Sequence, residues 1–140
     1  MIHTQMEKMA VALPTAAGTS AVTLTVDTLG YDGVSFVAVR AANAATTFAS
    51  VLKIEQSNDD STYVAAPGFT GGTDFTIAQA TTTTAVAYKL DIDSKTLRRY
   101  LKLTVTPSVS VNVAACARLY RGENAPTTAT EAGVIGWVVG

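Results

Sequence analysis

The stretch KIEQSNDDSTYVAAPG, from Lys53 to Gly68, places two adjacent aspartates between segments whose side chains alternate in polarity. Alternation with a period of two sends successive side chains to opposite faces of a sheet, so this stretch predicts two strands joined by a reverse turn. If Glu55 lies opposite Val64, the apolar side chains of both strands share one face. We therefore expect a β-hairpin whose four-residue loop, NDDS, is built on a type I turn.

The aspartates of this loop, Asp59 and Asp60, have two interpretations. In a hairpin loop, Asn and Asp side chains accept hydrogen bonds from nearby backbone amides and stabilise the turn. The alternative is a calcium site, which needs six or more oxygen ligands, and the loop supplies few of them. We interpret the pair as part of the turn, keep calcium as the weaker alternative, and expect no other metal and no cofactor.

The same alternation recurs along most of the chain. Besides the two hairpin strands in SVLKIEQS (50–57) and STYVAA (61–66), it is found in AVTLTVDT (21–28), DFTIAQ (74–79), AVAYKLDID (85–93), RRYLKLTVT (98–106) and VSVNVAACARLYRG (109–122). A further predicted strand, VSFVAVRAA (34–42), is apolar on both faces, as expected for a central strand or one covered by a neighbour. No segment predicts a helix of three turns, although DSKTL (93–97) predicts a single turn capped by Asp93 or Ser94. About eight short strands separated by turns predict an all-β fold, a single antiparallel β-sandwich or jelly roll.

A length of 140 residues suits one domain with a real core. We place the sandwich at residues 21–122. Residues 1–20 lack alternation and are expected to form an extended N-terminal arm. Residues 123–140 are expected to form a polar linker followed by the apolar tail GVIGWVVG.

Composition excludes several classes of partner and compartment. Hydrophobic residues make up 48% of the chain, charged residues 15%, and the net charge is −1, so no basic surface for nucleic acid is expected. No apolar run approaches the roughly 20 residues of a membrane span, and no signal peptide is recognisable. The mean hydropathy of +0.26 then indicates that apolar surface is buried against other subunits.

Catalytic chemistry is poorly supplied. The single histidine, His3, lies in the expected N-terminal arm, and the single cysteine, Cys116, lies in an apolar segment. Neither can readily complete a nucleophile–base pair or a zinc site. Asp91 and Asp93 share the polar face of one strand, about 7 Å apart by strand geometry, and could flank a cation or a sugar. We predict a non-enzymatic protein.

The hairpin VLKIEQSNDDSTYVAAPG, the strands LRRYLKLTVT and VNVAACARLYRG, and the Ala/Thr/Val-rich chain with loose ends resemble the small β-sandwich decoration proteins of tailed-bacteriophage heads. The resemblance covers roughly residues 33–122. It implies a protein of the virion, made in the host cytoplasm, that binds the major capsid protein on the capsid exterior as a symmetric dimer or trimer and stabilises the head. In this hypothesis the two ends make the contacts, and the interface residues are Met1, Ile2, Met6, Met9, Val11, Leu13, Val134, Ile135, Trp137 and Val138.

The same succession of strands also resembles discoidin-type jelly rolls, which bind carbohydrates or lipids, although their flanking disulfide cysteines are missing here. This likeness implies a glycan-binding module on a virion or cell surface. Its site would use the loops NDDS and GFTGG together with Asp91 and Asp93. Stacking rings near these loops are few; the candidates are Tyr31, Tyr63, Phe69 and Phe75.

Overall fold

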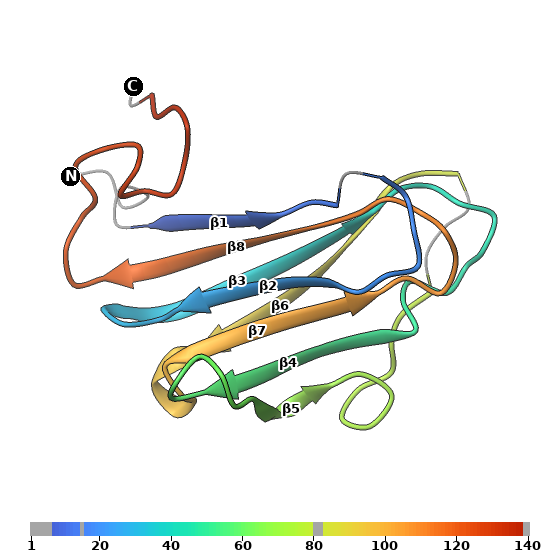
Figure 1. Ribbon diagram of the computed structural model, residues 1–140, viewed down its shortest axis with the longest axis horizontal. Helices are drawn as coiled ribbons and strands as arrows, with labels where there is room; N and C mark the ends of the chain where they lie inside the picture. Colours follow the sequence, from blue (N-terminus) through green and yellow to red (C-terminus); the bar gives the residue numbers. More distant parts are fainter. Residues whose placement is uncertain (1–6, 15, 80–82, 139–140) are drawn as a thin grey trace.

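The computed structural model describes residues 7–14, 16–79 and 83–138, and confirms the all-β fold predicted from the sequence. Within these described residues, the regular structure consists of eight strands and one short 3₁₀-helix (Figure 1). In chain order they are β1 (Lys8–Ala12), β2 (Val22–Asp27), β3 (Tyr31–Arg40), β4 (Val51–Ser57), β5 (Val64–Thr70), β6 (Val86–Asp93), η2 (Ser94–Thr96), β7 (Tyr100–Thr106) and β8 (Val113–Gly122).

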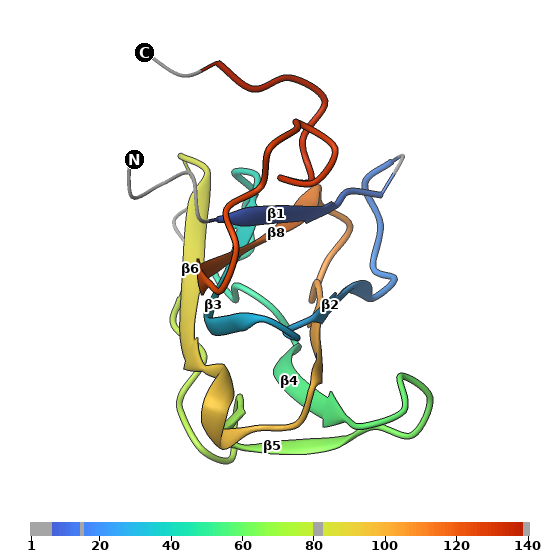
Figure 2. The same ribbon diagram turned by 90° about the vertical axis from the view of Figure 1, so that its left-hand side faces the viewer.

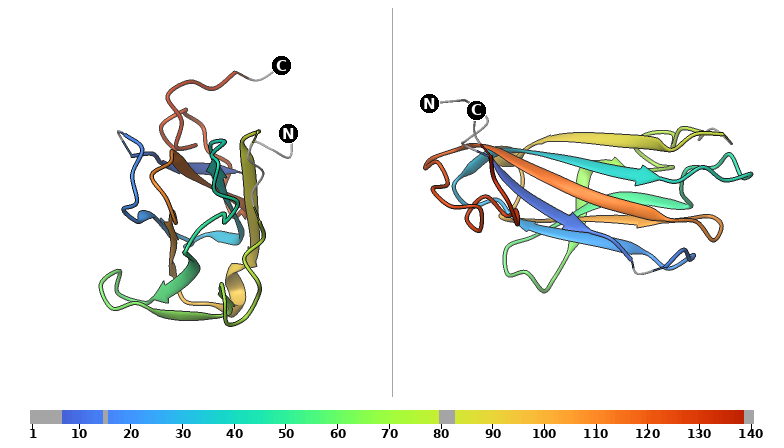
Figure 3. Two further views of the ribbon diagram at one scale, coloured as in Figure 1. Left: turned by 90° about the vertical axis from the view of Figure 1, so that its right-hand side faces the viewer. Right: turned by 90° about the horizontal axis from the view of Figure 1, so that it is seen from above.

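The strands form two four-stranded antiparallel sheets. The first sheet has the order β1-β8-β3-β6 and the second the order β2-β7-β4-β5. Figure 2 shows the two sheets packed across a common interior, and Figure 3 shows that the strands run along the long axis of the molecule. This arrangement is the expected β-sandwich.

The interior is built from the apolar side of each alternating strand. In β2 and β7 every second residue is buried, whereas the residues between them are exposed or half-buried. The buried side chains of the two sheets meet in one hydrophobic core, with Phe36 of the central strand β3 fully buried within it. Apolar burial of this kind is the main stabilising contribution to the fold.

Arg40 is an exception to this pattern. It ends the inward-facing row of β3 and its side chain is fully buried. Nη2 donates a hydrogen bond of 2.6 Å to the carbonyl oxygen of Ala45, but Nε and Nη1 have no hydrogen-bond partner among the residues that the structure describes. A buried cation without an anionic partner costs free energy, so Arg40 is a weak point of the core.

The hairpin differs from the predicted register by one residue. Glu55 pairs with Ala65, not with Val64, and Gln56 pairs with Val64. The connection between β4 and β5 therefore spans residues 58–63, and the predicted four-residue loop is wrong. Within this connection Asp60 adopts a left-handed conformation with φ of 57°.

The predicted strand at residues 74–79 is absent. The chain there forms a turn, in which the backbone amide of Gly72 donates to the carbonyl of Phe75 and the Asp74 carboxylate accepts from the Thr70 amide at 2.9 Å. Phe75 takes part only in an isolated bridge with Gly71. Local hydrogen bonds of the aspartate thus override a short period-two pattern.

Both chain ends are more integrated than predicted. The expected N-terminal arm contains β1, which pairs along its whole length with β8, so the sandwich begins before residue 21. The expected C-terminal linker folds into a turn in which Thr127 donates two hydrogen bonds, of 2.7 and 2.8 Å, to the Glu131 carboxylate. The Ala132 carbonyl then accepts a 2.8 Å hydrogen bond from the Met9 amide, which ties this segment to β1. The predicted helical turn is confirmed as η2, with Asp93 as its cap.

Candidate functional site

The outer face of the first sheet carries the features that point to binding. Along β8 the exposed side of the strand runs from Ala114 and Cys116, which are small and apolar, to Arg118 and Tyr120, which are polar. The neighbouring strands follow the same division, because Val39 pairs with Ala114 and Ser35 pairs with Arg118. One end of this face is therefore apolar and the other is polar.

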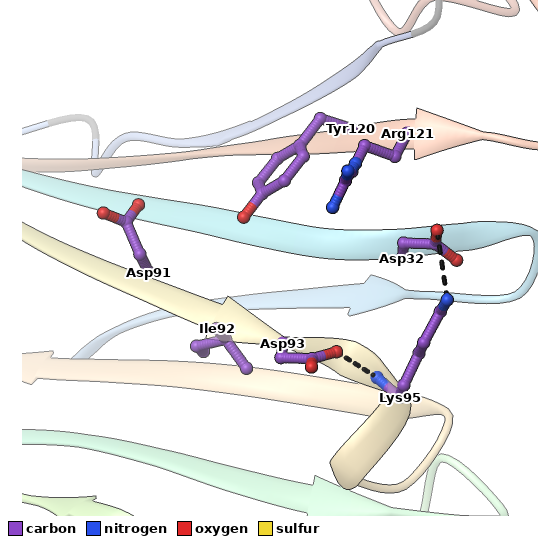
Figure 4. A pocket seen from close by; sticks show the side chains of 7 residues that line it. All are labelled: Asp32, Asp91, Ile92, Asp93, Lys95, Tyr120 and Arg121. Carbon is purple, nitrogen blue, oxygen red and sulfur yellow. Dashed lines mark hydrogen bonds and ion pairs between the residues drawn. The ribbon is translucent and has the colours of Figure 1, made fainter.

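The polar end contains a cleft of about 270 Å³ (Figure 4). Its residues come from β3, β6, η2 and β8: Asp32, Asp91, Ile92, Asp93, Lys95, Tyr120 and Arg121. We call it the polar cleft.

Ion pairs occupy most carboxylates of the polar cleft. Lys95 Nζ lies 3.3 Å from Asp32 Oδ2, and Lys89 Nζ lies 2.9 Å from Asp91 Oδ2. The Lys89 ammonium, followed by the Ser35 hydroxyl, lowers the pKa of Asp91 below its ordinary value of 3.8. Asp93 accepts a 3.0 Å hydrogen bond from the Lys95 amide as the cap of η2. Asp91 and Asp93 thus point outward as the sequence predicted, on a surface with balanced charge.

Two local features position the remaining polar groups of the cleft. The Tyr120 ring lies directly on Gly33, where an added Cβ would come within 2.3 Å of the ring, so only glycine admits this close approach. Arg121 has a left-handed φ of 55°. In a regular strand successive side chains point to opposite faces, but Figure 4 shows Tyr120 and Arg121 both directed toward the cleft.

The apolar end of the same face forms a second depression, of about 320 Å³, which we call the apolar groove. Its residues are Val11, Ala12, Leu13, Val39, Ala114, Ala115 and Cys116. Val11 and Leu13 are 73% and 71% exposed, and Val39 is 38% exposed. Scattered exposed apolar residues are common, but a contiguous apolar surface marks an interaction site.

The predicted interface residues fall into three groups. Met1, Ile2 and Met6 lie outside the described residues. Val11 and Leu13 belong to the apolar groove, with Met9 half-buried at its end of β1. In the tail, Ile135 and Val138 are almost completely exposed, whereas Val134 and Trp137 are half-buried.

The loop aspartates bond within their own loop. Asp59 Oδ1 accepts hydrogen bonds from the Ser57 hydroxyl at 2.7 Å, the Ser61 amide at 3.0 Å and the Thr62 amide at 2.9 Å. Asp60 instead accepts a hydrogen bond from the Tyr63 hydroxyl. The two carboxylates therefore accept hydrogen bonds from different residues of the loop. Across the described segments of the chain, no three His, Cys, Asp or Glu side chains group as a potential metal site.

The hydrogen bonds to Asp59, chiefly that from the Thr62 amide and then that from the Ser57 hydroxyl, hold the pKa of its carboxyl well below the ordinary value of 3.8. A carboxyl whose pKa is lower in the folded state adds stability above the unfolded pKa, and this contribution is lost as the pH falls through the folded pKa. We expect Asp59→Ala to lower the urea midpoint of unfolding at pH 7, by an amount that shrinks as the pH is taken below 3.8.

The neighbouring substitution Asn58→Ala is the control for Asp59→Ala, because Asn58 is exposed on the same loop and lacks the carboxylate. It should change the midpoint little at any pH. A deficit in Asp59→Ala that stays constant down to strongly acidic pH would show that the ionised carboxylate does not stabilise the loop.

The sequence did not predict several of the residues that line the two depressions. Val39 and Ala114, which line the apolar groove, and Tyr120 and Arg121, which line the polar cleft, were read only as strand residues. A signal was present for Val39, because VSFVAVRAA is apolar on both faces and no helix is available to cover the second face. No sequence signal reports the left-handed backbone of Arg121.

No protein-family model matches this sequence, and no curated protein is significantly similar to it. Solved structures resemble it at low levels. A family 32 carbohydrate-binding module from a Clostridium perfringens family 31 glycoside hydrolase superposes with a TM-score of 0.41 and 17% identity, over 86% of this chain and 80% of the module. A protein of the disulfide-linked pili of Bacillus endospore appendages gives a TM-score of 0.38 and 11% identity, over 81% and 86%.

The core of Drosophila NLP gives a TM-score of 0.37 and 13% identity, over 84% of this chain and 99% of that domain. These likenesses, all below a TM-score of 0.5 and 25% identity, assign no function. The chain is an all-β sandwich with two depressions on one sheet. Among its described residues, no helix is long and apolar enough to cross a membrane.

Proposed function

We propose that this chain is a non-enzymatic structural protein that binds other proteins through the outer face of its first sheet. We propose further that its partner is the major capsid protein on the exterior of a bacteriophage capsid. The observation that carries the proposal is the apolar groove, in which Val11 and Leu13 expose more than two thirds of their surface. Water-exposed apolar surface of this kind is stabilised by burial against a partner. The resemblance of the sequence to head decoration proteins supplies the identity of the partner.

The isolated chain exposes the apolar side chains of the groove to water, which is unfavourable, and a partner that covers them removes this cost. At roughly 25 cal/mol per Å² of apolar surface removed from water, covering Val11, Leu13 and Val39 contributes a few kcal/mol to association. An apolar centre with polar residues beside it is the usual composition of a protein–protein interface. Docked on a capsid, the rigid sandwich would close gaps between capsomers and stabilise the head.

Binding to capsids tests the proposal. Expanded capsids assembled from the major capsid protein encoded in the same genome are sedimented with the full chain. We expect co-sedimentation, and at least tenfold weaker binding for Leu13→Asp. The matched control is Val64→Asp, which introduces the same charge at an exposed valine of β5 in the second sheet and should bind normally. Failure of the unaltered chain to co-sediment would overturn the proposal.

A second candidate is glycan binding at the polar cleft, favoured by the joint presence of Tyr120 and Arg121 beside ion-paired carboxylates. A sugar would stack on the exposed part of the ring and hydrogen-bond with the charged groups. The predicted loops NDDS and GFTGG take no part in this cleft. A glycan array probed with the full chain and with Tyr120→Ala tests this candidate, which requires a signal that the substitution abolishes.

A further inference from the structure

The apolar groove lies beside an unpaired strand edge. β1 is the outermost strand of the first sheet, and the Met9 amide donates to Ala132 on the side away from β8. In an antiparallel pair, alternate residues direct their N–H and C=O groups to the same side. The backbone groups of Val11 therefore point to the same open edge as those of Met9, and within the described part of the chain Met9 alone has a backbone partner there.

The C-terminal tail matches the apolar groove in chemistry. From Ala132 to Val138 the sequence AGVIGWV carries no charge, and Ile135 and Val138 are 108% and 96% exposed. The groove is likewise lined without a charged side chain. Neither surface loses the hydration of a charge when they meet, so their association is favoured by apolar burial alone.

The chain's own tail is directed elsewhere. Gly133 lies against the Met9 carbonyl with a left-handed φ of 74°, and the Val134 amide donates to the Ala129 carbonyl at 2.9 Å. These contacts fix the direction in which the tail leaves the sandwich. Figures 1 and 2 show the C-terminal segment rising away from the sandwich at the end where β1 begins, whereas the groove lies toward the end of β1.

We infer that residues 134–138 of one copy dock in the apolar groove of a second copy and extend its first sheet by pairing with the open edge of β1. Five extended residues span about 17 Å, which is long enough to pass the open part of this edge beyond Met9, at Val11 and Leu13. Strand addition of this type combines backbone hydrogen bonds with side-chain pockets, and reciprocal exchange would double the contact in a closed dimer. The inference rests on the proposed protein-binding role of the groove and names a neighbouring copy as its occupant, so that the capsid is bound by the dimer.

Solution mass tests this inference. Sedimentation equilibrium of the full chain should give a concentration-dependent dimer. Leu13→Asp in the groove and Ile135→Asp in the tail should each weaken self-association at least tenfold. The matched control is Val64→Asp, because Val64 is a partly exposed valine on β5 of the second sheet. It should dimerise normally. A monomeric parent chain, or a dimer insensitive to both substitutions, would overturn the inference.

Cross-linking identifies the occupant. In a Cys116→Ala background, Leu13→Cys and Ile135→Cys variants are mixed and oxidised, and we expect a disulfide-linked pair of chains. A cross-link that forms only within one chain carrying both cysteines would instead place the tail in its own groove and refute the exchange. The emission of Trp137, the only tryptophan, should shift to the blue on dimerisation and should not shift in Leu13→Asp.

Failure of the inference is distinguishable from failure of the proposed function. If the parent chain is monomeric, or forms a dimer insensitive to both substitutions, and still binds capsids, the groove binds the capsid protein directly and the inference fails alone. If the parent chain dimerises but never binds capsids, the capsid role fails and the exchange stands.

Discussion

Replacement of Phe36 by alanine is expected to lower the free energy of unfolding by about 3–5 kcal/mol, the largest loss of any single substitution considered. Phe36 is fully buried at the centre of β3, opposite Leu90 of β6 and Ala117 of β8. Neighbouring side chains cannot easily move to fill the space that the ring leaves, because β3 is paired with β6 on one side and with β8 on the other. The loss combines the transfer of a large apolar side chain with the cavity that it leaves.

Urea unfolding followed by far-ultraviolet circular dichroism measures this effect. The control is Thr23→Ala, since Thr23 is exposed on β2, and it should change stability by no more than about 0.5 kcal/mol. A loss below about 1.5 kcal/mol in Phe36→Ala would show that the two sheets do not pack around this ring.

Replacement of Arg40 by methionine is expected to raise the free energy of unfolding by about 1–4 kcal/mol. The substitution removes a fully buried cation whose Nε and Nη1 have no partner, and it fills a similar volume with an apolar side chain. Among the described residues, the substitution removes one hydrogen bond, that to the Ala45 carbonyl. One hydrogen bond contributes about 1 kcal/mol, less than the burial of an uncompensated charge costs.

The matched control makes the same change at an exposed arginine. Arg99 forms a bidentate ion pair with Asp27, with distances of 2.8 and 2.7 Å, on the protein surface. Arg99→Met should therefore destabilise slightly, with the sign opposite to that of Arg40→Met. A clear destabilisation by Arg40→Met would mean that Arg40 gains partners in solution, such as buried water.

The two depressions of the first sheet divide its outer face by chemistry. At one end, ion pairs and a tyrosine suit polar ligands; at the other, exposed apolar side chains suit protein contacts. Because of this division, each proposed binding activity can be tested by a separate substitution. Leu13→Asp alters the apolar groove, and Tyr120→Ala alters the polar cleft. The assays therefore separate a structural role from glycan binding.

The sequence predicted the strands whose burial follows alternation most regularly. β2, β6 and β7 were expected within a few residues of their bounds, because each has one face toward the core and one toward water. β1 was missed because MAVA offers little contrast between its two faces. The hairpin register was missed because the polarity pattern favoured a four-residue loop, whereas the connection between β4 and β5 has six residues, 58–63.

Sequence by itself determined the all-β class, the sandwich and the apolar character of the C-terminal tail, because these depend on periodicity and composition, which are local properties. Tertiary structure alone decided which residues line the two depressions. It places Val11 and Leu13 beside Val39 and Ala114 in the apolar groove, and Tyr120 and Arg121 beside Asp32 in the polar cleft. It also brings the Met9 amide to the Ala132 carbonyl, to which it donates a hydrogen bond. These contacts join residues far apart in the chain through the pairing of β1, β3 and β8. No local pattern specifies which strands become neighbours, because that choice depends on how the whole set of apolar faces is buried together.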